Sequence, residues 1–100
     1  MVAFTGGIWS SRGRITAPHA QLHVFPEALR LVFFDQDYVL PREAINALSK
    51  MGIRPVNGLR IRHSTPLYPS YLVFWPRGLF NNREYEKLRR SLDDNGYTVT

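Results

Sequence analysis

Two pairs of arginines, each with one residue between them, are the feature of this sequence best suited to a binding chemistry. Arg60 and Arg62 lie in the alternating run 59–63, and Arg12 and Arg14 repeat the same spacing. Residues two apart on a β-strand point to the same side, and a planar guanidinium offers paired donors to phosphate or carboxylate. If the two strands are neighbours, four guanidinium groups converge on one anion-binding surface. The alternative is a solvated outer sheet face whose arginine stems shield apolar neighbours.

Aromatic residues provide a second candidate surface. Tyr68 and Phe80 lie near prolines and on either side of Arg77, so we predict a contact patch there, with Arg77 joining the anion-binding arginines. Aromatic rings beside basic side chains also stack on unpaired nucleobases, which would indicate single-stranded nucleic-acid binding. We expect Phe74 and Trp75 to fill the core instead, because a small domain needs large apolar side chains there.

The residue types that commonly carry out catalysis are not arranged at catalytic spacing. His19, His23 and His63 lack the spacing of metal ligands, and the sequence has no cysteine and no glycine-rich phosphate loop. Asp35 and Asp37 lie between two apolar runs, which indicates a turn joining two strands rather than a catalytic carboxylate pair. We therefore expect a protein that is not an enzyme and that binds no metal or cofactor.

The composition indicates one basic globular domain over residues 1–100. Hydrophobic residues make up 44% and charged residues 21%, and thirteen basic against eight acidic residues give a net charge of +5. This excess of positive charge favours binding to phosphates, nucleic acid or anionic membrane surfaces. The longest apolar runs, 31–34 and 71–75, are far shorter than the ~20 residues that span a bilayer, and no secretory leader is visible. We expect a cytoplasmic protein, with peripheral membrane association as a variant of that expectation.

Apolar alternation between frequent glycines and prolines predicts a mainly β protein. Leu22 and Val24 share one side of a strand, and Leu59 and Ile61 do the same in another. Residues 1–10 show no such alternation, and we allow a flexible N-terminal segment there. The predicted strands cover residues 11–16, 21–25, 28–34, 37–40, 59–63 and 71–75, the last being apolar on both faces as in a central or barrel strand.

One amphipathic helix is predicted near the C-terminus, over about residues 82–95. Asn81 suits its N-cap, and Gly96 suits the position just after its last turn. Three apolar residues fall at helical spacing within it: Tyr85, Leu88 and Leu92.

In two further segments, residues close together in the sequence indicate a secondary structure. Residues 97–99 suit a short strand after the helix. The segment 41–51 is ambiguous, because its initial proline, apolar spacing and following glycine favour a helix. Tertiary context would instead make its first half an edge strand, since helix propensity is a weak preference.

The order of these elements resembles a bacterial pleckstrin-homology-like (PH-like) domain. The resemblance is carried by apolar residues and turn formers at 29–33, 39–45, 58–64 and 69–75, followed by 88–96, and it spans most of the chain. It implies a bent antiparallel sheet or barrel closed at one end by the C-terminal helix. It also implies a binding or scaffolding role whose ligand is a protein partner or an anionic surface such as a lipid membrane.

The functional hypothesis from the sequence is therefore a non-catalytic binding module with a basic sheet face. The alternative is a small basic protein that binds single-stranded nucleic acid. An open sheet edge would also permit a homodimer.

Overall fold

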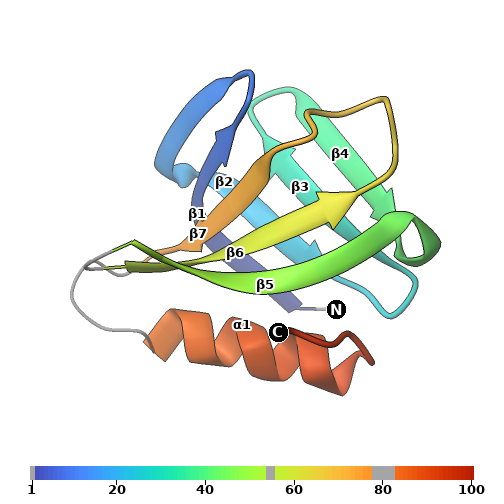
Figure 1. The fold of residues 1–100 in the computed structure, drawn as a ribbon. Helices are drawn as coiled ribbons and strands as arrows, with labels where there is room; N and C mark the ends of the chain where they lie inside the picture. The colour runs from blue at the N-terminus through green and yellow to red at the C-terminus, as the bar shows by residue number, and fades with distance from the viewer. Residues whose placement is uncertain (1, 54–55, 78–82) are drawn as a thin grey trace.

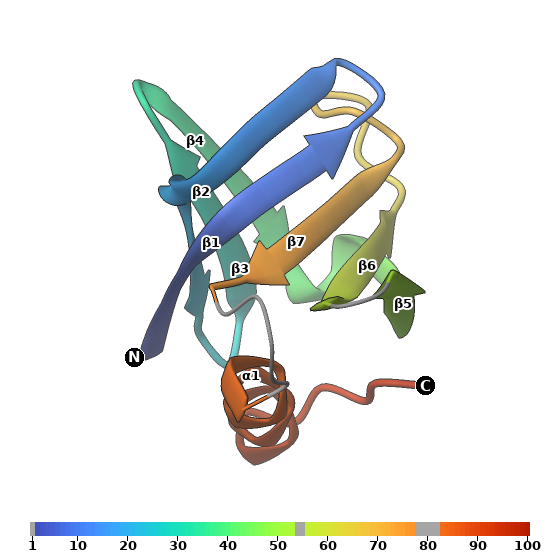
Figure 2. The same cartoon turned by 90° about the vertical axis from the view of Figure 1, so that its left-hand side faces the viewer.

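The computed structural model describes residues 2–53, 56–77 and 83–100. Within these ranges seven antiparallel strands form one sheet in the order β4-β3-β2-β1-β7-β6-β5. The sheet curls into a half-barrel, and α1 lies across one end of it (Figures 1 and 2). The mainly β fold with one C-terminal helix is thus confirmed. The elements are β1 Val2–Ser10, β2 Gly13–Val24, β3 Ala28–Phe33, β4 Gln36–Pro41, η1 Arg42–Ala44, β5 Ile45–Ile53, β6 Val56–His63, β7 Leu72–Pro76 and α1 Arg83–Asp94.

Strand β1 lies in the middle of the sheet, between β2 and β7. Residues 2–10, for which the sequence allowed a flexible segment, form this strand. The predicted strand at 11–16 is in fact a turn followed by the start of β2. Gly6 and Gly7 resemble a turn signal, but here they allow close approach between strands: a Cβ on Gly6 would lie 1.7 Å from the carbonyl oxygen of Trp75.

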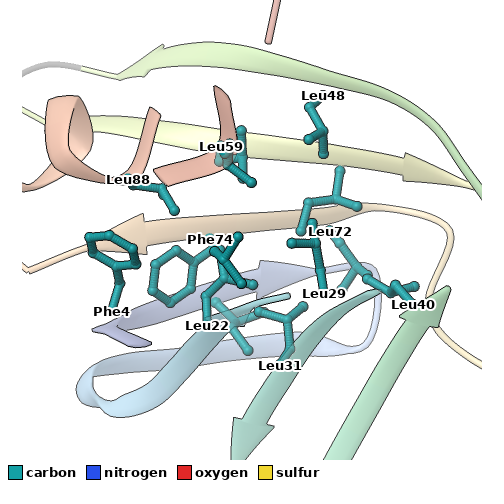
Figure 3. Packing of buried hydrophobic residues seen from close by; sticks show 14 of the residues in the cluster. Phe4, Leu22, Leu29, Leu31, Leu40, Leu48, Leu59, Leu72, Phe74 and Leu88 are labelled. Atoms are coloured by element: carbon teal, nitrogen blue, oxygen red, sulfur yellow. The ribbon is translucent and has the colours of Figure 1, made fainter. Parts of the chain in front are cut away.

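The inward side of the half-barrel is filled by the alternate apolar residues that the sequence pattern places there (Figure 3). Leu22 and Val24 of β2 and Leu59 and Ile61 of β6 are all essentially inaccessible to solvent. The predicted helical stripe closes the end of this core, and its members are buried: Tyr85, Leu88 and Leu92.

The ambiguous segment 41–51 forms a short 3-10 turn, Arg42–Ala44, and then the edge strand β5. The helical signals are overridden because β6 offers this segment a nearly continuous antiparallel ladder. The predicted short strand at 97–99 is reduced to one parallel bridge between Val99 and Leu48. Beside it, the Thr100 N–H donates to the Leu48 carbonyl at 2.9 Å.

Helix α1 begins at Arg83 and ends at Asp94, close to the predicted 82–95. The proposed N-cap, Asn81, lies outside the described residues. Gly96 follows the helix with a φ of +84°. The Tyr97 N–H donates to the Leu92 carbonyl at 2.8 Å and the Gly96 N–H to the Asp93 carbonyl at 3.0 Å, a Schellman motif. The predicted glycine stop is confirmed.

Arg42 fastens the C-terminal end of α1 to the turn between β2 and β3. One guanidinium nitrogen, Nη1, donates to the carbonyls of Pro26 at 3.0 Å and Asn95 at 2.9 Å, and Nη2 donates to the carbonyl of Gly96. The guanidinium carbon also lies 4.7 Å from the ring centroid of Tyr97. A single side chain thereby joins the start of η1, the β2–β3 turn and the end of the helix.

Tyr97 makes a second connection at the same place. Its hydroxyl donates to the Phe25 carbonyl at 2.7 Å. Burial raises the pKa of Tyr97 above its usual value, because the phenolate would be poorly solvated there.

Candidate functional site

Strand β7 is apolar on both faces, and the two faces serve different purposes. Leu72 and Phe74 point inward and belong to the hydrophobic core. Val73 is completely buried but lies outside that cluster, and Trp75 is half-buried. Because successive strand residues point to opposite sides, Val73 and Trp75 belong to the outer face of the sheet. That face therefore has an apolar cluster of its own.

The strand register brings two arginines and a tryptophan into one row with Val73. Arg14 of β2 pairs with Trp9 of β1, Trp9 pairs with Val73 of β7, and Val73 pairs with Arg60 of β6. Neighbouring strands lie about 4.8 Å apart, so the row from Arg14 to Arg60 spans about 14 Å. Four adjacent strands thus present arginine, tryptophan, valine and arginine side by side.

Each arginine of this row lies over an aromatic ring. The guanidinium carbon of Arg14 is 5.2 Å from the ring centroid of Trp9, and that of Arg60 is 5.0 Å from the centroid of Tyr71. The Trp9 and Trp75 centroids are 5.0 Å apart with the ring planes at 48°. A cation–π contact gives the guanidinium N–H donors no oxygen acceptor, so these donors stay available to an anion.

A glycine on the neighbouring strand β6 makes room for Trp75. Gly7 of β1 pairs with Trp75, and a Cβ on Gly58 of β6 would lie 2.3 Å from the indole Cδ1 and 2.8 Å from Cγ1 of Val73. The indole therefore lies against the β6 backbone, and its Nε1 is buried with no hydrogen-bond partner among the described residues. The orientation of Trp75 depends on Gly58 having no side chain.

We call this surface the basic-aromatic face and define it by Trp9, Arg14, Arg60, Arg62, Tyr71 and Trp75. The stretches 2–24 and 45–77, which contain β1, β2, β5, β6 and β7, have no Asp or Glu. The ion pairs in the described ranges lie elsewhere, between Arg30 and Asp37 and between Lys87 and Glu84. No acidic side chain in the described part of the chain pairs with an arginine of the face, so its positive charge is uncompensated locally.

The predicted pairing of arginines on one strand is correct for Arg60 and Arg62 and wrong for Arg12 and Arg14, and the two strands are not neighbours. Arg60 and Arg62 do share the outer face of β6, where Arg62 is exposed opposite Ala47. Arg12 lies in the β1–β2 turn rather than on a strand. The strands β2 and β6 are not neighbours, because β1 and β7 separate them. Arg14 on β2 and Arg60 on β6 are instead connected through the aromatic residues that lie between them on the outer face.

The predicted patch of Tyr68, Phe80 and Arg77 lies only partly within the described residues. Tyr68 is half-buried: its ring stacks on Tyr38 at 4.4 Å and its hydroxyl accepts the N–H of Val39 at 3.1 Å. Phe80 lies outside the described residues. Arg77 follows the end of β7 and is exposed, and its backbone N–H donates to the carbonyl oxygen of Thr5 at 2.8 Å.

Sequence reasoning missed Trp9 and placed Trp75 in the wrong layer. Trp9 was missed because β1 was not recognised as a strand. Trp75 was assigned to the core, and a strand that is apolar on both faces gives no sequence signal for which side faces inward. A usable signal was available nonetheless: the chain has only two tryptophans, and each lies within five residues of an arginine in an acid-free stretch.

The remaining titratable residues lie apart from this face. Asp35 lies in the predicted turn, whereas Asp37 lies in β4, where the hydrogen bond from Arg30 holds the pKa of its carboxyl below the usual value. His19 stacks on Phe34, and Nε2 of His63 donates to the Pro69 carbonyl at 2.8 Å. In the described ranges no three His, Asp or Glu side chains are grouped as metal ligands would be.

Comparison with known proteins adds no family to this description. No family model matches the chain, and searches of curated proteins and of solved structures give no match. In the described parts of the chain, no helix combines the length and apolar character needed to cross a membrane. The functional argument therefore depends on the fold and on the basic-aromatic face.

Proposed function

We propose that this chain is a non-catalytic, PH-like binding module that holds an anionic partner on its basic-aromatic face. The seven-stranded half-barrel with a C-terminal helix at one end is consistent with a PH-like fold. The observation that carries the proposal is the row of uncompensated arginines stacked on aromatic rings across β2, β1, β7 and β6.

The stacking of the arginines favours binding over a purely solvated face. A free arginine side chain loses considerable rotamer entropy when it closes on a phosphate or carboxylate. Arg14 and Arg60 are already held by Trp9 and Tyr71, so less freedom remains to be lost on binding. The acid-free strands leave a positive potential that attracts anions and weakens as salt increases.

A binding assay with a charge-matched control tests the proposal. Wild-type protein is compared with Arg60→Glu/Arg62→Glu and with Arg89→Glu/Arg90→Glu, in which two exposed arginines of α1 undergo the same charge change. The probes are polyphosphate, polyglutamate and vesicles of phosphatidylglycerol or phosphatidylcholine, at low salt and at ~0.15 M salt.

We expect wild type to bind at least one anionic probe, to ignore neutral vesicles and to bind more weakly as salt rises. The sheet-face variant should lose this binding and the helix variant should keep most of it. Equal losses in the two variants would show that only net charge matters, and the proposal would then be wrong. Failure of wild type to bind any anionic probe would also refute it.

A further inference from the structure

We infer that the anionic partner of the basic-aromatic face is single-stranded nucleic acid, bound with its bases stacked on this face. The inference rests on the proposed function, because it names the partner of the same site. Single-stranded binding needs a positive groove or face that follows the backbone, together with flat side chains on which successive bases stack. The basic-aromatic face offers both the positive charge and the flat side chains in one row of paired strand residues.

The two arginine–aromatic stacks act as platforms for bases. In each pair the guanidinium carbon lies over a ring, that of Trp9 for Arg14 and that of Tyr71 for Arg60. A nucleobase can stack on the side of a guanidinium that faces away from the ring, while the N–H groups contact the adjacent phosphate. Every base has a flat face, so this mode of binding tolerates different sequences.

The dimensions of the row fit a short stretch of a single strand. The four strands from β2 to β6 place Arg14 and Arg60 about 14 Å apart. A stacked strand advances about 3.4 Å per nucleotide, so the row accommodates about four nucleotides. Arg62 lies one pleat further along β6 and extends the positive charge at one end of the row.

The alternative occupants fit the observations less well. A membrane-inserting surface needs protruding apolar side chains, whereas Trp9 and Trp75 are half-buried against each other. Among the described residues, the apolar side chains that protrude most are Phe34, 74% exposed in the β3–β4 turn, and Leu67, 71% exposed in the β6–β7 loop. An acidic peptide would use the arginines and the rings that hold them, but its carboxylates offer no flat aromatic surface to stack on the guanidinium groups.

Tryptophan fluorescence reports directly on the proposed site, because both tryptophans of the chain lie in it. The protein is titrated with a dodecamer of thymidylate, with an abasic dodecamer of the same charge, and with polyphosphate. Phosphatidylglycerol vesicles and polyglutamate are further probes. We expect the thymidylate to quench the tryptophans and to bind at least about fivefold more tightly than the abasic strand, the lower end expected for stacking one base.

Arginine-to-lysine variants separate stacking from charge. Arg14→Lys/Arg60→Lys keeps both positive charges but removes the planar guanidinium groups. It should bind thymidylate at least about fivefold more weakly and should lose less affinity for polyphosphate, because polyphosphate keeps the charge attraction and loses only the paired donors. The matched control Arg89→Lys/Arg90→Lys, on α1, should change neither affinity. These substitutions leave the tryptophans and the core intact, so folding is preserved.

The outcomes distinguish the inference from the proposed function. Equal affinity for thymidylate and the abasic strand, or equal losses of thymidylate and polyphosphate binding in Arg14→Lys/Arg60→Lys, would overturn the inference and leave the proposed function standing. Tighter binding of vesicles or polyglutamate than of thymidylate would do the same. If no anionic probe binds wild type, both fail.

Discussion

Replacing Arg42 with alanine should destabilise the fold strongly, even though the residue is exposed. Its guanidinium donates to the carbonyls of Pro26, Asn95 and Gly96 and lies over the ring of Tyr97. Two of these carbonyls follow the last turn of α1, where a positive charge also interacts favourably with the helix dipole. Removing the side chain breaks the connection between the helix and the β2–β3 turn.

The expected cost can be estimated from these contacts. Water can partly replace the three hydrogen bonds because the side chain is exposed, so each contributes about 0.5–1 kcal/mol, the lower part of the usual range. The contact with the Tyr97 ring adds about 0.5–1 kcal/mol at an exposed site. The free energy of unfolding of Arg42→Ala should therefore be about 2–4 kcal/mol below that of wild type. Each kcal/mol corresponds to roughly 4–8 °C in Tm for a domain of this size.

Urea unfolding followed by circular dichroism measures this difference. Arg42→Lys keeps the charge but not the planar set of donors, so it should lose about half as much stability as the alanine variant. Arg62→Ala, at an exposed position on the sheet, is the control and should stay within about 0.5 kcal/mol of wild type. A loss of less than about 0.5 kcal/mol in Arg42→Ala would refute the reasoning, because it would mean that water replaces all of these contacts at no cost.

Three further predictions concern the outer cluster, the core and the alkaline range. Gly58→Ala should push Trp75 away from β6, shift the tryptophan emission and destabilise the fold by about 1–3 kcal/mol, whereas Gly52→Ala, with no atom closer than 3.6 Å to its new Cβ, should do neither in the same unfolding titration. Leu88→Ala, at a fully buried position, should lower the free energy of unfolding by about 2–5 kcal/mol in urea, and a change below 1 kcal/mol would contradict its place in the core. Because the pKa of Tyr97 is raised in the folded state, its contribution to stability is complete below about pH 10 and is lost as pH rises through the folded value. The wild-type stability should thus fall more steeply above pH 10 than that of Tyr97→Phe, as measured by urea titrations across this range; parallel pH profiles would rule this contribution out.

Strands with one polar and one apolar side could be predicted from the sequence. The alternations around Leu22 and around Leu59 reflect burial on a single face, and both strands have the predicted inward residues. The C-terminal helix was equally predictable, because its apolar stripe and its glycine stop are local signals. The patterns of these elements depend on one buried side only, so they can be recognised without knowing which neighbours cover that side.

Elements whose form depends on distant neighbours could not be predicted. Gly6 and Gly7 are needed because β7 and β2 pass close to β1, and nothing near them in the sequence indicates this. Residues 45–53 form a strand because β6 pairs with them, against their local helical signals. The candidate site was predictable only in part for the same reason. The spacing of Arg14 and Arg60 is visible in the sequence, but the row that joins them requires β1 and β7 to lie between β2 and β6.

The position of β1 in the middle of the sheet has a consequence for the order of folding. Every other pairing between the named strands joins strands that follow one another in the chain, whereas the β1–β7 pairing joins Gly6 to Pro76 and Ser10 to Leu72. Bringing together segments so far apart in the chain costs loop-closure entropy and makes their pairing slow. The β1–β7 pairing, which we call the seam, should therefore form after the hairpins on either side of it. During synthesis, one edge of β1 remains open until residues 72–76 have left the ribosome. Pulse-labelled hydrogen exchange should accordingly show protection at the seam after protection of the β3–β4 and β5–β6 hairpins, and simultaneous protection would show that the half-barrel closes in one step.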